Sequence, residues 1–169
     1  MEEYTVKVYQ NNAGKRIEWH QNDQLHRSDG PAHIGYYPTG NKMYEECFLN
    51  GNLHNNNNPA IIDYYENGNK RYEIHYLNGK CHNENGPARI DYYESGNKRY
   101  EHYYLNSELH NENGPAAIVY YENGNIESEW YYLNGVVLSK EGWLKKTNKD
   151  SCDGKVVEID GKKYKLTAV

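Results

Sequence analysis

Apolar and aromatic residues alternate with polar residues in short runs, and each run ends at a turn signal. A segment such as PAIIDYY is rich in Ile and Tyr and begins with a proline, which suits the first position of a strand. The turn ENGN follows, KRYEIHYL has the pattern of a second strand, and LNGKCHNENG returns to the next unit. The pattern therefore predicts a series of β-hairpins.

The hairpin pattern repeats every 28 residues without an insertion, over residues 25–52, 53–80, 81–108 and 109–136. A degenerate copy, VKVYQNNAGKRIEWHQNDQ, comes before them, and terminal repeats are often atypical because they cap a stack. We expect a capping repeat in residues 1–24, four repeats in 25–136 and a separate tail in 137–169. The predicted fold is all-β: tandem hairpin repeats that form an elongated, twisted antiparallel meander sheet, with a capping hairpin at the C-terminus.

The register of each hairpin depends on the loop at its tip. A two-residue turn at Asn67-Gly68 would place Ile62 opposite Glu73, whereas a three-residue loop, Asn67-Gly68-Asn69, places Ile62 opposite Ile74. We choose the three-residue loop, with a left-handed glycine, because register follows the apolar pattern. The predicted buried face carries Ala60, Ile62, Tyr64, Tyr72, Ile74 and Tyr76 with their counterparts. The predicted wetter face carries Asp63, Tyr65, Arg71, Glu73, His75 and Leu77 with theirs.

Two departures from the repeat pattern carry structural predictions. Asn58 stands where the other units have a glycine, and we expect a left-handed conformation there because Asn shares it most readily with glycine. Cys81 replaces a leucine, so we interpret it as a small buried hydrophobe and not as a nucleophile. Three cysteines without a CxxC pair argue against a disulfide framework or a zinc site.

Charge is distributed unevenly along the chain. Residues 1–136 hold 11 Lys and Arg against 19 Asp and Glu, a balance of −8, whereas residues 137–169 hold 8 Lys against 5 acidic residues, a balance of +3. The acidic repeats would repel nucleic acid and anionic lipid, so direct nucleic-acid binding is not expected and membrane binding is unfavoured. The basic tail has a hairpin signal at Asp160-Gly161. It is either a cap over the last edge strand or a docking arm.

Composition favours a thin sheet in a reducing compartment. Apolar residues make up only 37% of the chain, and its 19 tyrosines combine a large ring with a polar tip. The acidic N-terminus does not have the pattern of a signal peptide, and no apolar run approaches the roughly 18 residues of a membrane span. We therefore expect a cytoplasmic protein, in the host cytoplasm if it is viral.

Two ladders of titratable residues invite a chemical interpretation. Equivalent positions in neighbouring units would lie about 10 Å apart, two strand spacings, so one histidine ladder cannot converge on a metal ion. We expect these histidines to tie the return loop to the backbone: His26, His54, His82 and His110. A regular glutamate ladder gives equivalent environments and not an acid–base pair, so a solvated or partner-facing stripe is expected. Motifs of nucleophiles or phosphate loops do not occur, so we predict no catalytic residue, metal, cofactor or small-molecule substrate.

The repeated segments resemble a known family. The unit LHRSDGPAHIGYYPTGNKMYEECFLNG and its three copies are similar to MORN-like repeats, above all to the variant with H-x-x-x-G-P-A, YY-x-x-G-x-K and E-x-x-x-x-N-G elements. Chains of this variant are often labelled antitoxin-like in bacteria, and similar arrays occur in phages and large viruses. The resemblance covers residues 25–136 well, 4–24 weakly and the tail not at all. It implies a meander of hairpins that acts as a scaffold or a protein-interaction module.

The leading hypothesis is a module that binds and inhibits a partner protein. A basic partner, such as a nuclease or another nucleic-acid-handling enzyme, would suit the acidic repeats, as for an antitoxin or a phage inhibitor of a host defence. The alternatives are a structural or membrane-associated scaffold, and tyrosines that only pack against one another. The predicted partner-binding residues are Tyr37, Tyr65, Tyr93, Tyr121, Asp63, Asp91, Glu45, Glu73, Glu101 and Glu129.

Overall fold

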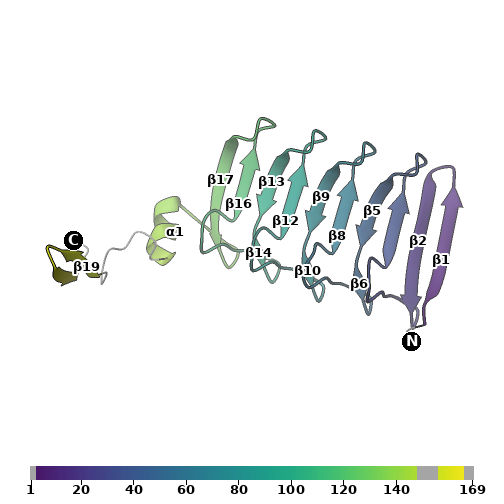
Figure 1. The fold of residues 1–169 in the computed structure, drawn as a ribbon, viewed down its shortest axis with the longest axis horizontal. Helices are drawn as coiled ribbons and strands as arrows, with labels where there is room; N and C mark the ends of the chain where they lie inside the picture. The colour runs from purple at the N-terminus through teal and green to yellow at the C-terminus, as the bar shows by residue number, and fades with distance from the viewer. Residues whose placement is uncertain (1–2, 148–155, 166–169) are drawn as a thin grey trace.

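The computed structural model describes residues 3–147 and 156–165 and shows a row of antiparallel hairpins joined into one open sheet (Figure 1). The first hairpin pairs β1 (Thr5–Asn11) with β2 (Gly14–Gln21), and the short β3 (Gln24–Leu25) lies beside β2. The next four hairpins are β4 (His33–Tyr36) with β5 (Lys42–Glu46), β8 (Ile61–Tyr64) with β9 (Lys70–Ile74), β12 (Arg89–Tyr92) with β13 (Lys98–His102), and β16 (Ala117–Tyr120) with β17 (Ile126–Leu133). The predicted meander is confirmed.

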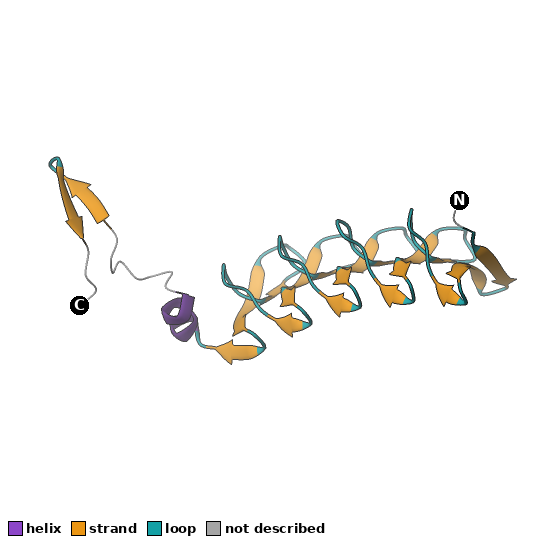
Figure 2. Cartoon of the chain, turned by 90° about the horizontal axis from the view of Figure 1, so that it is seen from below, coloured by secondary structure: helices purple, strands orange, loops and turns teal. Residues whose placement is uncertain are grey.

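A second, smaller hairpin ends each unit, and sequence analysis had treated this segment as a return loop. These hairpins are β6 (Phe48–Leu49) with β7 (Asn52–Leu53), β10 (Tyr76–Leu77) with β11 (Lys80–Cys81), β14 (Tyr104–Leu105) with β15 (Glu108–Leu109), and the end of β17 with β18 (Val136–Leu138). Each turns at two residues with positive φ, as in Asn78 (50°) and Gly79 (77°). The Asn-Gly pairs were the available signal, since such a turn requires left-handed residues. Figure 2 shows these units recurring along the row.

The predicted register of the large hairpins is wrong. Ile62 pairs with Glu73, and Asp63 pairs with Tyr72. At the tip, the Tyr65 N–H donates to the Asn69 carbonyl and Gly68 has φ of 90°, so the three-residue loop is Glu66-Asn67-Gly68, one residue earlier than expected. A bulge follows, because Tyr64 pairs with Lys70 and Asp63 with Tyr72, which leaves Arg71 as the extra residue.

This register rearranges the two faces, because directly paired residues share a face and neighbours along a strand alternate. We call one side the uniform face, since it carries the same residues in all four units: Ile62, Tyr64 and Glu73 with their counterparts. We call the other side the variable face: Ile61, Asp63, Tyr72, Ile74 and Tyr76 with their counterparts. The expectation that Tyr72 and Ile74 lie with Ile62 is therefore wrong, and so is the placement of Glu73 on a wetter face.

The core is thin and consists largely of small side chains. The alanines that open the hairpins, Ala32, Ala60, Ala88 and Ala116, have no exposed surface. Glu73 and Glu101 are buried with them, at 8% and 5% exposure. The expected left-handed conformation at Asn58 is not found, and Gly30, Gly86 and Gly114 at the same position in other units also lack a positive φ.

Helix α1 (Lys140–Thr147), which sequence analysis did not predict, packs at the C-terminal end of the sheet. Trp143 is 4% exposed, contacts the Tyr131 ring and donates from Nε1 to the Asn111 carbonyl at 2.8 Å. The hairpin predicted around Asp160-Gly161 exists as β19 (Val156–Ile159) and β20 (Lys162–Lys165), which pair with each other. Whether it caps the array or docks a partner stays a prediction.

Candidate functional site

The glutamate ladder on the uniform face is held inside the protein. Glu73 accepts hydrogen bonds from Lys70 Nζ at 2.5 Å and from the Tyr92 hydroxyl of the next hairpin at 2.5 Å. Burial alone would raise the pKa of Glu73, but these donors and the lysine charge outweigh it, and the pKa lies below its ordinary value. Burial and the carboxylate raise the pKa of Tyr92 in turn. The same arrangement recurs at Glu45 and Glu101.

The tyrosine ladder at the hairpin tips also links one unit to the next. The hydroxyl groups of Tyr37, Tyr65 and Tyr93 donate to the carbonyl groups of Tyr64, Tyr92 and Tyr120, at 2.7, 2.9 and 2.8 Å. Asn41, Asn69 and Asn97 add side-chain bonds to the carbonyls of Glu66, Glu94 and Glu122. Most of the tyrosines predicted to bind a partner therefore hold the array together.

The loop histidines have the structural role that the sequence predicted. The backbone N–H groups of Asn50, Asn78, Asn106 and Asn134 donate to Nδ1 of His26, His54, His82 and His110, at 3.0 to 3.2 Å. Each bond joins the return loop at the start of a unit to the small hairpin at the end of that unit. Within residues 3–147 and 156–165, no cluster of three His, Cys, Asp or Glu residues is arranged to hold a metal ion.

The predicted binding residues are therefore spread over different surfaces. Glu45, Glu73 and Glu101 lie on the uniform face, while Asp63 and Asp91 lie on the variable face. Only the last unit leaves its ladder residues open: Tyr121 is 50% exposed, and Glu129 is exposed with a single long contact to Tyr131, at 3.4 Å. Their role in binding stays a prediction.

The variable face carries several positions at which the four units differ in side-chain chemistry. Where one strand carries Ile61, the other units carry His33, Arg89 and Ala117, and where one carries Ile74, the others carry Glu46, His102 and Trp130. These differences are visible in the sequence when the units are compared position by position. The predicted binding residues were instead positions that repeat in every unit. In a repeat array, differences of this kind alter a surface without altering the scaffold that presents it.

Tyrosine hydroxyl groups separate the two faces further. On the uniform face, the hydroxyls of Tyr64, Tyr92 and Tyr120 each donate to a glutamate. On the variable face, Tyr44 bonds to His33 Nε2 at 2.9 Å. The remaining tyrosines of that face have no hydroxyl partner within the described part of the chain: Tyr72, Tyr76, Tyr100, Tyr104 and Tyr132. Their polar tips are available to another molecule.

A hollow of about 480 Å³ lies on the variable face of the last two units. Its floor is β16, where Ala117 is smaller than its counterpart Arg89 and the uncharged Val119 stands in place of Asp91. Tyr100, His102 and Tyr104 line one side, and Trp130 and Tyr132 line the other. The His102 ring stacks on Tyr100 at 6.1 Å, and burial lowers the pKa of His102, which favours the neutral imidazole. We call this hollow the aromatic trough.

The opposite end of the variable face is filled by a polar cluster. His33 Nδ1 lies 2.8 Å from Glu46, and Glu18 pairs with His20 Nε2 at 2.9 Å and with Arg16 at 3.0 Å. Gly35 leaves room for the Tyr44 ring, since a Cβ there would meet that ring at 2.4 Å. The two ends of one face therefore differ: one is packed and charged, and the other is open and aromatic.

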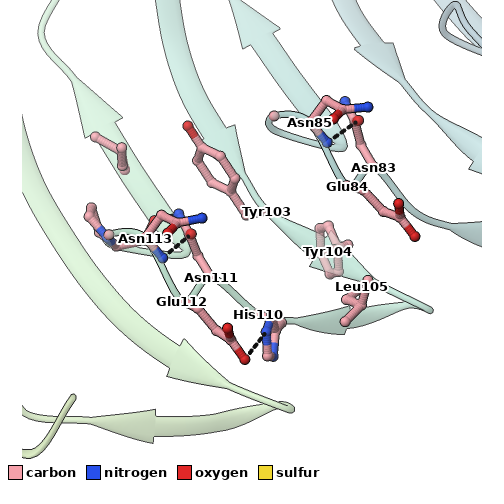
Figure 3. A pocket seen from close by; sticks show the side chains of 14 residues that line it. Asn83, Glu84, Asn85, Tyr103, Tyr104, Leu105, His110, Asn111, Glu112 and Asn113 are labelled. Atoms are coloured by element: carbon pink, nitrogen blue, oxygen red, sulfur yellow. Dashed lines mark hydrogen bonds and ion pairs between the residues drawn. The ribbon is translucent and has the colours of Figure 1, made fainter. Parts of the chain in front are cut away.

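Another hollow, of about 600 Å³, lies between two consecutive return loops. Figure 3 shows Tyr103 between the loop of Glu84 and Asn85 and the loop of Glu112. His110 Nε2 faces Glu112 at 3.7 Å. The hollow is open and polar, and its histidine already serves the backbone contact described above.

Neither described cysteine has the environment of a reactive thiol. Cys47 and Cys81 are free, and burial raises the pKa of both, to about 11 at Cys81. This agrees with the interpretation of Cys81 as a small hydrophobe. Cys152 lies outside the described residues. No helix among the described residues has the length and apolar character needed to cross a membrane.

Comparison with known proteins places the repeat. The family model of the MORN repeat variant matches residues 61–78 and 116–134. The first match covers the hairpin β8–β9 and β10, and the second covers the hairpin β16–β17. A search of curated proteins finds no match to the chain. The two matched segments are therefore similar to the MORN repeat variant, and each lies in one of the four 28-residue hairpin units.

Proposed function

We propose that the chain is a non-enzymatic module that binds a partner protein on its variable face. The observation that carries the proposal is a difference between the tyrosine hydroxyls of the two faces. Within the described residues, those of Tyr64, Tyr92 and Tyr120 on the uniform face are bonded to glutamates and only that of Tyr36 is not, whereas most of those on the variable face have no partner. Tyrosine is favoured at interfaces because it combines contact area with a hydrogen-bonding tip. A rigid scaffold with differing side chains on one side suits recognition of one partner.

The narrower proposal is that the module binds and inhibits a basic protein. An antitoxin-like protein or an inhibitor of a defence nuclease would act in this way. The buried glutamates are compensated by lysines, so the acidic charge that a partner meets lies on the loops. Asp29, Glu84 and Glu112 have side chains 72, 75 and 70% exposed, and Glu66, Glu94 and Glu122 project at the hairpin tips. Exposed charges of this kind would attract a basic protein and speed its encounter.

The test is affinity capture with matched variants. The tagged chain is incubated with lysate of its own organism, and bound proteins are identified by mass spectrometry at low and moderate salt. Trp130→Ala is expected to reduce the amount of captured partner at least about tenfold, because it removes the largest side chain of the aromatic trough. Ile126→Ala, which removes a large exposed apolar side chain outside that trough, is the control and should retain the partner.

Inhibition has its own measurement. The captured partner is purified and its activity is followed as the chain is added in increasing amounts. A nucleic-acid-handling enzyme that loses activity at one equivalent supports the narrower proposal. Recovery of membrane material or only of the chain itself, or a partner that every variable-face variant retains, would contradict the proposed function.

A further inference from the structure

We propose that the aromatic trough binds an uncharged, proline-containing extended segment of the partner protein, which lies along β16. The inference rests on the proposed function and adds the chemistry of the segment that is recognised. Proline-rich segments adopt an extended left-handed helix and dock in grooves lined by aromatic side chains. The shape, the polar groups and the charge of the trough each support this occupant.

The shape of the trough follows from the strand order. β16 lies between β13 and β17, so the two aromatic walls stand about 10 Å apart, two strand spacings. Ala117 and Val119 form a low floor between them, and Leu109 continues it. At the same position of the first unit, the Tyr44 ring fills the space over Gly35. A slot of this width, with apolar walls and floor, suits an extended chain with compact apolar side chains.

The polar groups of the trough point to backbone carbonyls as their partners. The hydroxyls of Tyr100, Tyr104 and Tyr132 and the Trp130 indole N–H have no hydrogen-bond partner within residues 3–147 and 156–165. The indole can only donate. A proline-rich segment leaves its carbonyls free, because its helix has no internal hydrogen bonds, and each proline lacks an N–H. A segment without prolines would instead present backbone N–H groups, and the indole cannot accept a hydrogen bond from them.

The charges of the trough are already compensated. Arg89 and Asp91 form a two-pronged pair with both distances at 2.7 Å. His102 has its Nδ1 atom buried without a hydrogen-bond partner and stacks against Tyr100. A lysine or arginine side chain would therefore find no free carboxylate in the trough. The basic character of the partner would act on the exposed loop glutamates and not on this segment.

The experiment is a titration of the full chain with a soluble oligoproline peptide, followed by the indole N–H signals in NMR spectra. We expect saturable shifts of the Trp130 signal, which is assigned by its loss in Trp130→Phe, and little change at Trp19 and Trp143. A glycine–serine peptide and an arginine-rich peptide of the same length are the control ligands, and neither should saturate. Equal or tighter binding of either control peptide would overturn the proposal, as would the absence of saturable oligoproline binding.

Variants localise the binding. Trp130→Ala is expected to weaken oligoproline binding at least about tenfold. Tyr104→Phe with Tyr132→Phe should weaken it without a change in shape, because those hydroxyls have no partner among the described residues. Ala117→Leu should fill the floor and abolish binding. Ile126→Ala should leave binding unchanged, and an equal loss in that control would overturn the proposal. Circular dichroism confirms that each variant is folded.

Failure of this inference is distinguishable from failure of the proposed function. If a natural partner requires Trp130 but oligoproline does not bind, the proposed function is supported and the inference of a proline-containing segment is wrong. If oligoproline binds in the trough but no variable-face substitution affects binding of the natural partner, the inference about the trough is supported and the proposed function is wrong.

Discussion

The Tyr92 hydroxyl donates to Glu73 across the boundary between two hairpins. The two residues are 19 positions apart in the sequence, and the same pair recurs as Tyr64 with Glu45 and as Tyr120 with Glu101. A buried carboxylate is costly unless it is hydrogen-bonded, so each glutamate depends on the following unit for part of its stabilisation.

Tyr92→Phe should therefore destabilise the array. The change leaves buried Glu73 without one of its two donors, and we expect a loss of about 1–3 kcal/mol in the free energy of unfolding, measured by urea denaturation. The matched control is Tyr104→Phe, whose hydroxyl has no partner among the described residues and whose loss should change stability by less than about 0.5 kcal/mol. Equal losses in the two variants would contradict the assignment of the faces.

A second comparison separates the internal tip tyrosines from the terminal one. Tyr65→Phe removes the bond to the Tyr92 carbonyl and should cost about 1 kcal/mol, whereas Tyr121→Phe should have almost no effect, since Tyr121 ends the ladder. Sequence analysis had placed Tyr65 and its counterparts on the wetter face and assigned them to partner binding. The structure predicts instead that Tyr65→Phe and Tyr93→Phe weaken the fold, as thermal unfolding monitored by circular dichroism would reveal.

A side chain at the second residue of a small-hairpin turn should cost stability, because that residue has a positive φ, as Ser107 does in the third unit (71°). Gly79 has φ of 77°, so Gly79→Ala forces alanine into a left-handed conformation and should destabilise the protein by about 1–2 kcal/mol. Gly86→Ala is the control, because Gly86 has no positive φ and an added Cβ would meet only the Asn83 amide at 3.8 Å. Denaturation midpoints that fall equally for both would argue against a conformational cause.

Stability should fall in two steps as the pH is lowered. Burial lowers the pKa of His75 and His102 below the ordinary 6.5, so the unfolded chain binds their protons first, and stability declines as pH falls from 6.5 through the folded-state pKa values. Glu73 also has a lowered pKa, so its contribution is present above 4.5 and is lost as pH falls through its folded pKa.

Variants assign the two steps. His102→Phe should reduce the decline below pH 6.5 and leave the acid step unchanged, whereas Glu73→Gln should reduce the acid step alone. The measurement is the urea midpoint at a series of pH values. A pH profile that neither substitution alters would show that other groups control the stability.

The sequence was sufficient for the repeat, the hairpins and the left-handed glycine at each tip, because these depend on local turn chemistry. It was insufficient for the register, because we matched apolar residues across the hairpin and assumed that Glu73 would prefer solvent. Lys70 and Tyr92 make burial of that carboxylate possible, and the second of these comes from the next unit. The bulge at Arg71 then shifts the pairing by one residue.

The candidate site was hidden for a related reason. Repetition drew attention to Tyr37 and its counterparts, yet repetition in this chain marks the contacts that join neighbouring units. Trp130 and Ala117 shape the aromatic trough. They depart from the repeat pattern, so a search for repeated positions did not predict them as binding residues. A helix such as α1, with a single buried residue, Trp143, gives little periodic signal, so its position could not be predicted from the apolar pattern.

The side-chain bonds between hairpins extend only to the adjacent unit. The Tyr-to-carbonyl, Tyr-to-Glu and His-to-Asn bonds span 27, 19 and 24 residues, less than the length of one repeat. Stability in such an array accumulates by nearest neighbours, as in a linear chain of coupled elements. Insertion or deletion of a whole unit in the gene would therefore lengthen or shorten the protein by one segment while every remaining junction keeps its partners. Duplication of a unit, followed by divergence of a few side chains on one side, offers this protein a simple evolutionary route to a new specificity.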